Sequence, residues 1–274
     1  MNVAASHEHL GRVLVIAGSD SGGGAGVQAD IKAVTALGGH AATAITAITA
    51  QNTLGVHGVF PIPLDVIEAQ ARAVLDDIGA DVVKTGMLGD ALIVALAGRL
   101  IADAGVPAVV DPVMAAKDGS ALLDAYALGA VREALIPHAT LLTPNAPEAA
   151  ALTGLQVETT DDLRRAGEAL LALGCDAVLM KGGHIPGERV IDLLMTPVSE
   201  TRFESGRIDT RHTHGTGCTL ASACAAGLAQ GMALEHAVRR ARNYVQEAIR
   251  RAPGFGAGHG PLDHAWPMRR DDGR

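Results

Sequence analysis

A glycine-rich turn that contains a cysteine, within residues 211–224, is the part of the sequence best suited to chemistry. It reads RHTHGTGCTLASAC, in which Gly215, Thr216 and Gly217 loosen the backbone and the residues from Cys218 onward favour a helix. A helix N-terminus leaves N–H groups unpaired in the field of the helix dipole, where they can hold a phosphate or an oxyanion. The same field stabilises a thiolate. We expect an anion site beside Cys218, although a buried structural cysteine would give the same short motif.

Other polar residues follow the short apolar runs that predict strands. In chain order they are Ser19-Asp20 with the glycine loop 22–26, Gln51-Asn52, Gly86-Met87, Asp111-Pro112-Val113, residues 143–148 and Lys181-Gly182-Gly183. In an open parallel sheet the ligand crevice lies outside the carboxyl ends of the strands. Two carboxylates, a lysine and several backbone donors at such a crevice match the needs of phosphoryl transfer with magnesium.

The elements that must position these residues alternate along the chain. Apolar runs predict strands at 12–17, 41–50, 81–85, 107–111, 140–143 and 177–180, with an extended piece at 59–62 and an antiparallel pair within 190–205. Helices are predicted after the loop 18–30 as far as residue 37, and at 64–78, 90–104, 126–135, 145–153, 160–173, 216–230 and 234–251. This alternation predicts βαβ units and one doubly wound, mostly parallel sheet with helices on both faces.

Composition agrees with that α/β class. Hydrophobic residues make up 48% of the 274 residues and aromatic residues only 2%, so the core must consist of Ala, Val, Leu and Ile, as in parallel sheets covered on both faces. We expect one domain over 12–266, with an N-terminal extension at 1–11 and a charged tail at 267–274.

Charge and cysteine content exclude several classes of function. The net charge is -8 and no basic run occurs, so nucleic acid is not expected as a partner. The three cysteines have neither disulfide-framework nor metal-site spacing, which favours a reducing cytoplasm. The start of the chain lacks a basic segment followed by an apolar one, and no apolar run reaches about eighteen residues, so we expect neither secretion nor membrane insertion.

Two common nucleotide-binding motifs are absent from the sequence. No GxxxxGK[ST] occurs, and neither glycine-rich loop supplies GxGxxG. The first absence excludes a P-loop kinase, and the second removes the main support for a dinucleotide-dependent oxidoreductase.

Seven segments together resemble the hydroxymethylpyrimidine and phosphomethylpyrimidine kinases of thiamine biosynthesis, which have the ribokinase-like fold. They are GSDSGGGAGVQAD (18–30), AQN (50–52), KTGML (84–88), DPVM (111–114), TPNAPEA (143–149), MKGGH (180–184) and HTHGTGCTL (212–220). The resemblance runs from about residue 12 to residue 266. It implies ATP-dependent phosphorylation of 4-amino-5-hydroxymethyl-2-methylpyrimidine, followed by phosphorylation of the monophosphate to the diphosphate.

The resemblance also implies which residues hold the pyrimidine. Asp30, Gln51 and Met87 would line its pocket, and the residues in contact with it would include Gly18, Ala25 and Val113. Chemistry supports Gln51, because one amide can both donate to a ring nitrogen and accept from an exocyclic amine. The alternatives are a polar residue that closes a strand for Gln51, a helix-surface carboxylate for Asp30 and a core side chain for Met87.

The phosphate side of the site follows in the same way. The resemblance makes Gly215, Thr216 and Gly217 an anion hole beside Cys218, the catalytic residue, and it assigns Asp111 and Glu148 to Mg²⁺ and Asn145 and Lys181 to the ATP phosphates. A carboxylate that ends an apolar strand, as Asp111 does, needs a partner. Glu148 could instead be an ordinary acid in the first turn of a helix.

The sequence assigns no site role to four further polar residues. His184, His212 and His214 are interpreted as loop or packing residues, and Lys117 as part of a mobile lid or as a solvated lysine.

Ribokinase-like enzymes commonly have Asp where this chain has Cys218. A helix N-terminus can lower a thiol pKa from about 8.5 into the range of a general base, so we expect Cys218 to take the proton of the hydroxymethyl group. A phosphate monoester is already largely ionised at neutral pH and needs no such base. On this hypothesis, Cys218→Ala damages the first phosphorylation more than the second.

Two rival functions remain. A pyridoxal kinase of the same superfamily phosphorylates a related hydroxymethyl heterocycle, and a non-catalytic pyrimidine-binding module would need the pocket alone. The family resemblance also suggests a homodimer.

Overall fold

The computed structural model describes residues 10–115, 119, 122–123 and 127–269. Its strands are β1 (Arg12–Asp20), β2 (His40–Asn52), β3 (Gly55–Pro61), β4 (Val82–Thr85), β5 (Ala108–Val110), β6 (Leu141–Leu142), β7 (Val178–Met180), β8 (Arg189–Thr196) and β9 (Ser199–Gly206). Its α-helices are α1 (Gly26–Ala36), α2 (Leu64–Ala73), α3 (Ala91–Ala104), α4 (Ala127–Ala130), α5 (Ala146–Thr153), α6 (Thr160–Leu171), α7 (Thr216–Ala229) and α8 (Leu234–Arg250).

These strands form one sheet in the order β3-β2-β1-β4-β5-β6-β7-β8-β9. The pairs from β2 through β7 are parallel, whereas β3 pairs antiparallel with β2 at one edge, and β8 and β9 continue antiparallel at the other edge. The chain starts at β1, builds outward through β2 to β3 at one edge, and then crosses to β4 on the other side of β1 and continues toward the opposite edge. The predicted doubly wound, mostly parallel sheet is therefore confirmed.

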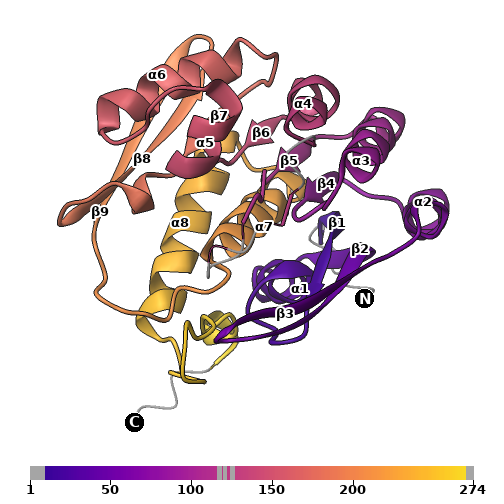
Figure 1. Ribbon diagram of the computed structural model, residues 1–274, viewed down its shortest axis with the longest axis horizontal. Coiled ribbons are helices and arrows are strands. Elements are labelled where there is room, and N and C mark those ends of the chain that lie inside the picture. Colours follow the sequence, from indigo (N-terminus) through magenta and orange to yellow (C-terminus); the bar gives the residue numbers. More distant parts are fainter. Residues whose placement is uncertain (1–9, 116–118, 120–121, 124–126, 270–274) are drawn as a thin grey trace, which may run out of the picture.

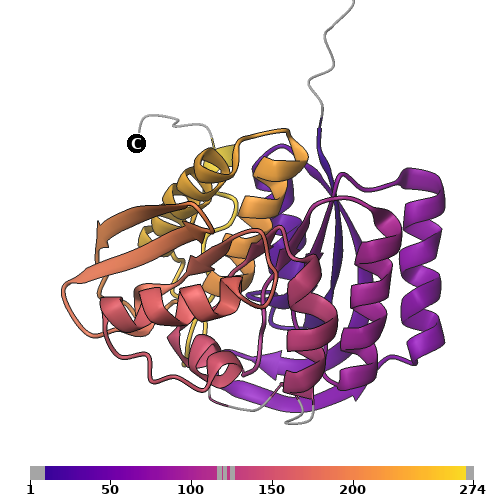
Figure 2. The same ribbon diagram turned by 90° about the horizontal axis from the view of Figure 1, so that it is seen from above.

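Helices cover both faces of the sheet (Figure 1), and an apolar cluster fills the space beneath each helix layer. Successive side chains of a strand point to opposite faces, so Val13 and Val15 of β1 face α1, α7 and α8, whereas Leu14 and Ile16 face the layer of α2 to α6. Figure 2 shows helices of this second layer standing side by side along the sheet. The result is the expected three-layer architecture.

Helix α7 is built almost entirely from small residues. Ala221, Ala223, Ala225 and Ala226 are fully buried against the sheet and the neighbouring helices α1 and α8. Small side chains let helix and sheet backbones approach closely at native packing density. This close packing brings the start of α7 to the carboxyl ends of the parallel strands.

Some boundaries differ from the sequence-based expectation. Helix α1 begins at Gly26, inside the predicted loop. Gly26 has a positive φ of 57°, and a Cβ at this position would lie 2.5 Å from the carbonyl oxygen of Gly18. The predicted helix 64–78 ends as an α-helix at Ala73 and continues as a π-helical turn, Val74–Ile78. The extended piece at 59–62 is part of the longer strand β3.

The single domain 12–266 stays a prediction, as do the extension 1–11 and the tail 267–274, of which residues 1–9 and 270–274 lie outside the described part. Lys117 also lies outside it. None of the helices in the described residues is both long and apolar enough to span a membrane.

Candidate active site

A cavity of about 690 Å³ lies at the carboxyl ends of the parallel strands. Every residue that the sequence assigned to the site, except Asp30, contributes to its lining: Gly18, Ala25, Gln51, Met87, Asp111, Val113, Asn145, Glu148, Lys181, Gly215, Thr216, Gly217 and Cys218. The structure thus brings together residues from seven separate segments of the chain. Their chemical roles depend on the geometry described next.

The turn before α7 has the backbone that an anion site requires. Gly215 is the N-cap residue with φ of 80°, and a Cβ at this position would lie 1.8 Å from the carbonyl oxygen of Gly24, so only glycine fits. No side chain of the described residues caps this N-terminus. The Thr216 N–H contacts the Thr213 carbonyl oxygen at 3.4 Å, and the following amides of the first turn are available to an anion.

Cys218 lies in this first turn and is half-buried. Burial raises the pKa of its thiol to about 12, while the nearby ammonium of Lys84 acts in the opposite direction. The expectation of a lowered pKa is wrong, because desolvation of the thiolate outweighs its attraction to Lys84. Cys218 is a neutral thiol near pH 7 and is poorly suited to act as a general base.

Lys181 connects two carboxylates in the floor of the cavity. Its Nζ lies 3.0 Å from Asp111 Oδ1 and 3.8 Å from Glu148 Oε2, and Thr143 donates a hydrogen bond of 2.9 Å to the same Asp111 oxygen. Burial alone would lower the pKa of Lys181, but the two carboxylates outweigh it and raise that pKa. Lys181 therefore stays charged next to the start of α7, where a Cβ on Gly217 would lie 3.4 Å from its Nζ.

Asn145 and Glu148 form a capping box at the start of α5. The Asn145 N–H donates to Glu148 Oε2 over 2.7 Å, and the Glu148 N–H donates to Asn145 Oδ1 over 2.9 Å. Burial raises the pKa of Glu148 to about 7, Lys181 lowers it and Asp111 raises it further. The Asn-x-x-Glu spacing thus has a local structural cause, which also places the carboxylate beside Lys181.

A magnesium site remains a prediction. No group of three or more His, Cys, Asp or Glu side chains in the described residues is arranged to hold a metal ion. Asp111 and Glu148 nevertheless fit Mg²⁺, because this ion is commonly held by one or two carboxylates together with substrate phosphates.

Asp30 is the exception among the predicted pocket residues. Its side chain is fully buried, and its Oδ1 accepts hydrogen bonds of 2.9 Å from Lys84 and 2.7 Å from Ser222. It does not line the cavity. The structure corrects this assignment: α1 begins early enough that position 30 faces α7 and the sheet, so Asp30 balances the buried charge of Lys84.

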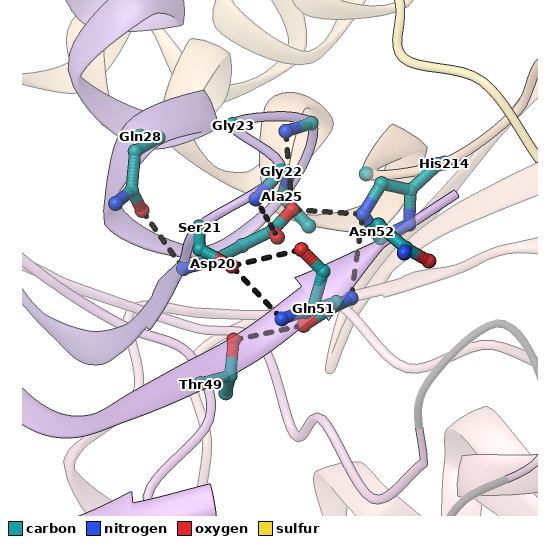
Figure 3. A network of polar contacts seen from close by, with 12 residues as sticks. Asp20, Ser21, Gly22, Gly23, Ala25, Gln28, Thr49, Gln51, Asn52 and His214 are labelled. Atoms are coloured by element: carbon teal, nitrogen blue, oxygen red, sulfur yellow. Dashed lines mark hydrogen bonds and ion pairs between the residues drawn. The ribbon is translucent and has the colours of Figure 1, made fainter. Parts of the chain in front are cut away.

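A polar network surrounds Gln51 (Figure 3), which also lines this cavity. Asp20 Oδ2 lies 2.8 Å from His214 Nε2 and accepts the N–H of Ala25 over 2.8 Å. The same His214 nitrogen lies 3.5 Å from Gln51 Nε2. Burial alone would raise the pKa of Asp20, but the hydrogen bonds from His214 and the loop amides outweigh it and lower that pKa, so this carboxylate is ionised at neutral pH.

A second cavity of about 680 Å³ adjoins the first. The two share lining residues around the start of α7, namely Asn145, Lys181, His184, Thr213, Thr216 and Gly217. Arg207 orders the loop beside this second cavity by donating to the carbonyl oxygens of Gly183, Ile185 and Gly187 over 2.6–2.8 Å. Two adjoining cavities with Lys181 at their junction provide separate places for a phosphoryl donor and an acceptor.

The family model of phosphomethylpyrimidine kinase matches residues 20–263. The chain belongs to the phosphomethylpyrimidine kinase family. A hydroxymethylpyrimidine/phosphomethylpyrimidine kinase from Streptomyces coelicolor is 52% identical over 256 residues, which cover 93% of this chain and 95% of the relative.

This member of the phosphomethylpyrimidine kinase family has the same fold as several kinases of known structure. A phosphomethylpyrimidine kinase from Clostridium difficile has a TM-score of 0.78 at 40% identity and covers 87% of this chain and 99% of its own. A pyridoxal kinase from Bacillus subtilis, solved as an ADP complex, has a TM-score of 0.88 at 37% identity. The match covers 95% of this chain and 100% of the pyridoxal kinase chain. The predicted ribokinase-like kinase fold is confirmed.

Within this phosphomethylpyrimidine kinase fold, sequence reasoning missed His214 as a site residue. His214 was interpreted as a loop or packing residue, yet it lines the cavity between Asp20 and Gln51. Its position four residues before Cys218 was visible in the sequence. Its contact with Asp20 was not, because the two residues are 194 positions apart.

Proposed function

We propose that the chain phosphorylates 4-amino-5-hydroxymethyl-2-methylpyrimidine with ATP and Mg²⁺ to the monophosphate, and then phosphorylates the monophosphate to the diphosphate. The observation that carries this proposal is the junction of the two cavities at Lys181 and the start of α7. Membership in the phosphomethylpyrimidine kinase family supports the same substrate.

The acceptor occupies the cavity that contains Gln51. The Gln51 amide reads the aminopyrimidine edge, Met87 and Val113 provide apolar walls, and Gly18 and Ala25 allow close approach of the ring. The hydroxymethyl group then points toward Cys218 at the start of α7. A phosphate on that group, in the second reaction, would lie in the same direction.

The nucleotide occupies the second cavity with its phosphates toward the junction. The first-turn amides of α7, at Gly215 to Cys218, hold the oxygens of the transferring phosphoryl group, and Lys181 neutralises part of their charge. Mg²⁺, held by Asp111 and Glu148, would supply further charge neutralisation when bound. Asn145 lines both cavities and is suited to orient the phosphates.

We propose for Cys218 a different role from the one that the sequence suggested. A thiol with a pKa of about 12 is protonated at neutral pH and cannot accept the substrate proton there. We assign it the role of a small, uncharged neighbour that tolerates both the hydroxymethyl group and its phosphate. Phosphoryl transfer depends mainly on positioning and on charge neutralisation, so it does not require a strong base.

Mass analysis of the products after incubation with ATP, Mg²⁺ and the pyrimidine alcohol tests the proposal. Addition of two phosphates is the expected result. No phosphorylated product from a folded, nucleotide-binding sample would contradict it, and the monophosphate alone would limit the chain to the first reaction.

Pyridoxal phosphorylation is a second candidate, favoured by the TM-score of 0.88 to the Bacillus subtilis pyridoxal kinase. Competition between pyridoxal and the pyrimidine alcohol separates the two functions. We expect the pyrimidine alcohol to have the larger kcat/KM, because Gln51 matches an aminopyrimidine edge.

A homodimer and a cytoplasmic location are also part of this proposal. The three cysteines are free, as a reducing compartment requires. Light scattering on the purified chain tests the dimer.

A further inference from the structure

Gln51 stands at an irregularity in strand β2. The pairing of β2 with β3 shifts register between Ala50 and Gln51, and such bulges often redirect a side chain at a functional site. Ser21 fixes the backbone on both sides: its hydroxyl donates to the Gln51 carbonyl oxygen over 2.8 Å and accepts the Gln51 N–H over 2.8 Å. The backbone of Gln51 is therefore held, and the orientation of its amide depends on the neighbouring side chains.

Thr49 constrains the first end of that amide. Its Oγ1 lies 2.9 Å from the carbonyl oxygen of Ser19 and 3.1 Å from Gln51 Oε1. A hydroxyl has a single proton and can donate to only one of these two acceptors. If the amide is turned by 180°, its N–H donates to Thr49 Oγ1 while Thr49 donates to Ser19, and both contacts become hydrogen bonds.

His214 constrains the other end in the same sense. Its Nε2 lies 2.8 Å from Asp20 Oδ2, and a carboxylate only accepts, so this nitrogen carries a proton. The Gln51 atom 3.5 Å away is the amide nitrogen, also a donor. The single proton of Nε2 stays with Asp20, so this contact sets two donors against each other. Turning the amide replaces the nitrogen with Oε1, which removes that repulsion and makes Oε1 a second, more distant acceptor for the His214 N–H. Oxygen and nitrogen of an amide have nearly the same shape, so the hydrogen-bond network decides between the two orientations.

We propose that Asp20, His214 and Thr49 are positioning residues that hold the Gln51 amide with Oε1 toward His214 and Nε2 toward Thr49, and that they thereby set the specificity of the site for an aminopyrimidine. This inference rests on the proposed function. His214, Asp20 and Thr49 are all at least nine-tenths buried, so solvent does not compete for these contacts.

The locked amide presents one free N–H and one free oxygen lone pair to the cavity in a fixed order. A 4-aminopyrimidine offers a ring nitrogen that accepts and an adjacent amine that donates, which matches that order. The 4-oxo analogue offers a ring N–H and a carbonyl oxygen at the same places, so donor would face donor and acceptor would face acceptor. Binding of the 4-oxo analogue would require the amide to turn and to lose its contacts with both Thr49 and His214.

The test compares kcat/KM for the 4-amino and 4-oxo forms of 5-hydroxymethyl-2-methylpyrimidine with ATP and Mg²⁺. Wild type should prefer the 4-amino form by roughly 10⁴-fold, as for sites that read a polar group by hydrogen bonds. Thr49→Val and His214→Phe each release one end of the amide and should lower this ratio by roughly 10-fold or more. Thr46→Val is the matched control, because Thr46 is on the same strand as Thr49. Its hydroxyl donates a hydrogen bond of 2.7 Å to the Met87 carbonyl oxygen and not to Gln51. It should leave the ratio unchanged.

Asp20→Asn provides a further variant if His214→Phe does not fold. Gly22 donates to Oδ1, whereas Ala25 and His214 contact Oδ2. The single oxygen of Asn can serve only one of these two positions; with that oxygen toward Gly22, the amide NH₂ faces His214 and loosens it, so this variant too should lower the ratio. Losses that are equal for both substrates, with an unchanged ratio in every folded variant, would overturn the inference alone. Absence of turnover of the aminopyrimidine by wild type would overturn the proposed function together with it.

Discussion

Lys181 Nζ lies 3.0 Å from Asp111 Oδ1 at the junction of the two cavities, although the two residues are 70 positions apart. The ammonium comes from the residue after β7 and the carboxylate from the residue after β5, and β6 lies between these strands. Parallel strands that end at one edge create this pairing, so the fold itself builds the charge arrangement for phosphoryl transfer.

Lys181→Met should lower kcat by about 100- to 1000-fold in both phosphorylations, because it removes a fixed cation from the transferring phosphoryl group. Lys181→Arg keeps the charge in a different shape and should recover part of the rate. Steady-state kinetics with each pyrimidine substrate measures both variants. An unchanged kcat in Lys181→Met would exclude Lys181 from the phosphate site.

Glu148 should make stability depend on pH. Its pKa is raised from 4.5 to about 7, so the folded chain binds this proton more tightly than the unfolded chain does. The stabilisation is fully present below about pH 4.5 and is lost as the pH rises through 7, a change on the order of 3 kcal/mol. Glu148→Gln mimics the protonated form and keeps an acceptor for the capping box.

The measurement is urea unfolding of wild type and Glu148→Gln from pH 4.5 to 8.5 without divalent ions. The free energy of unfolding of wild type should fall relative to that of the variant across this range. A difference that does not change with pH would show that Glu148 has an ordinary pKa.

Cys218→Ala should reduce the two phosphorylations to a similar degree. A thiol with a pKa of about 12 supplies no thiolate to either reaction near pH 7, so the asymmetry expected from a general base disappears. Separate assays with the alcohol and the monophosphate measure the two losses. A loss in the first reaction more than about tenfold greater than in the second would restore the base mechanism.

Alkylation of Cys218 by iodoacetamide should also stay slow up to about pH 9.

Local pattern was sufficient for much of the fold and for most of the cavity. Val13 and Leu14 already show the run of apolar residues that predicts a strand buried on both faces, and residues at strand ends, such as Gln51 and Lys181, follow from the geometry of parallel sheets. The family resemblance then distinguished Gln51 and Met87 from ordinary polar and core residues.

Properties that depend on the tertiary structure could not be predicted in the same way. Asp30 lies in a segment that resembles the family pocket, but its partners Lys84 and Ser222 come from β4 and α7. The pKa of Cys218 depends on how far the folded chain excludes water from the thiol, and the GTGC motif does not predict this. The helix dipole is a local effect, so the sequence predicted it. Desolvation of the Cys218 thiolate depends on the whole fold, so the sequence did not predict it.

Gly215 and Gly231 stand at opposite ends of α7 and form a matched pair for the last prediction. Both have positive φ, 80° and 78°, so alanine should cost each position about 1–2 kcal/mol of backbone strain. A Cβ at Gly215 would also meet the Gly24 carbonyl oxygen at 1.8 Å, whereas a Cβ at Gly231 meets nothing within 4 Å. The difference between the two variants therefore isolates the packing of the glycine turn against the loop 22–26.

Gly215→Ala should lower the free energy of unfolding by more than about 3 kcal/mol and should raise KM for ATP, because the turn can accommodate the methyl group only by moving away from the loop. Gly231→Ala should lower the free energy of unfolding only by the cost of its backbone strain, and its KM for ATP should equal that of wild type. Urea unfolding and ATP-dependent kinetics on the two proteins provide the comparison. Equal effects of the two substitutions would mean that the contact between Gly215 and Gly24 contributes neither to stability nor to the anion site.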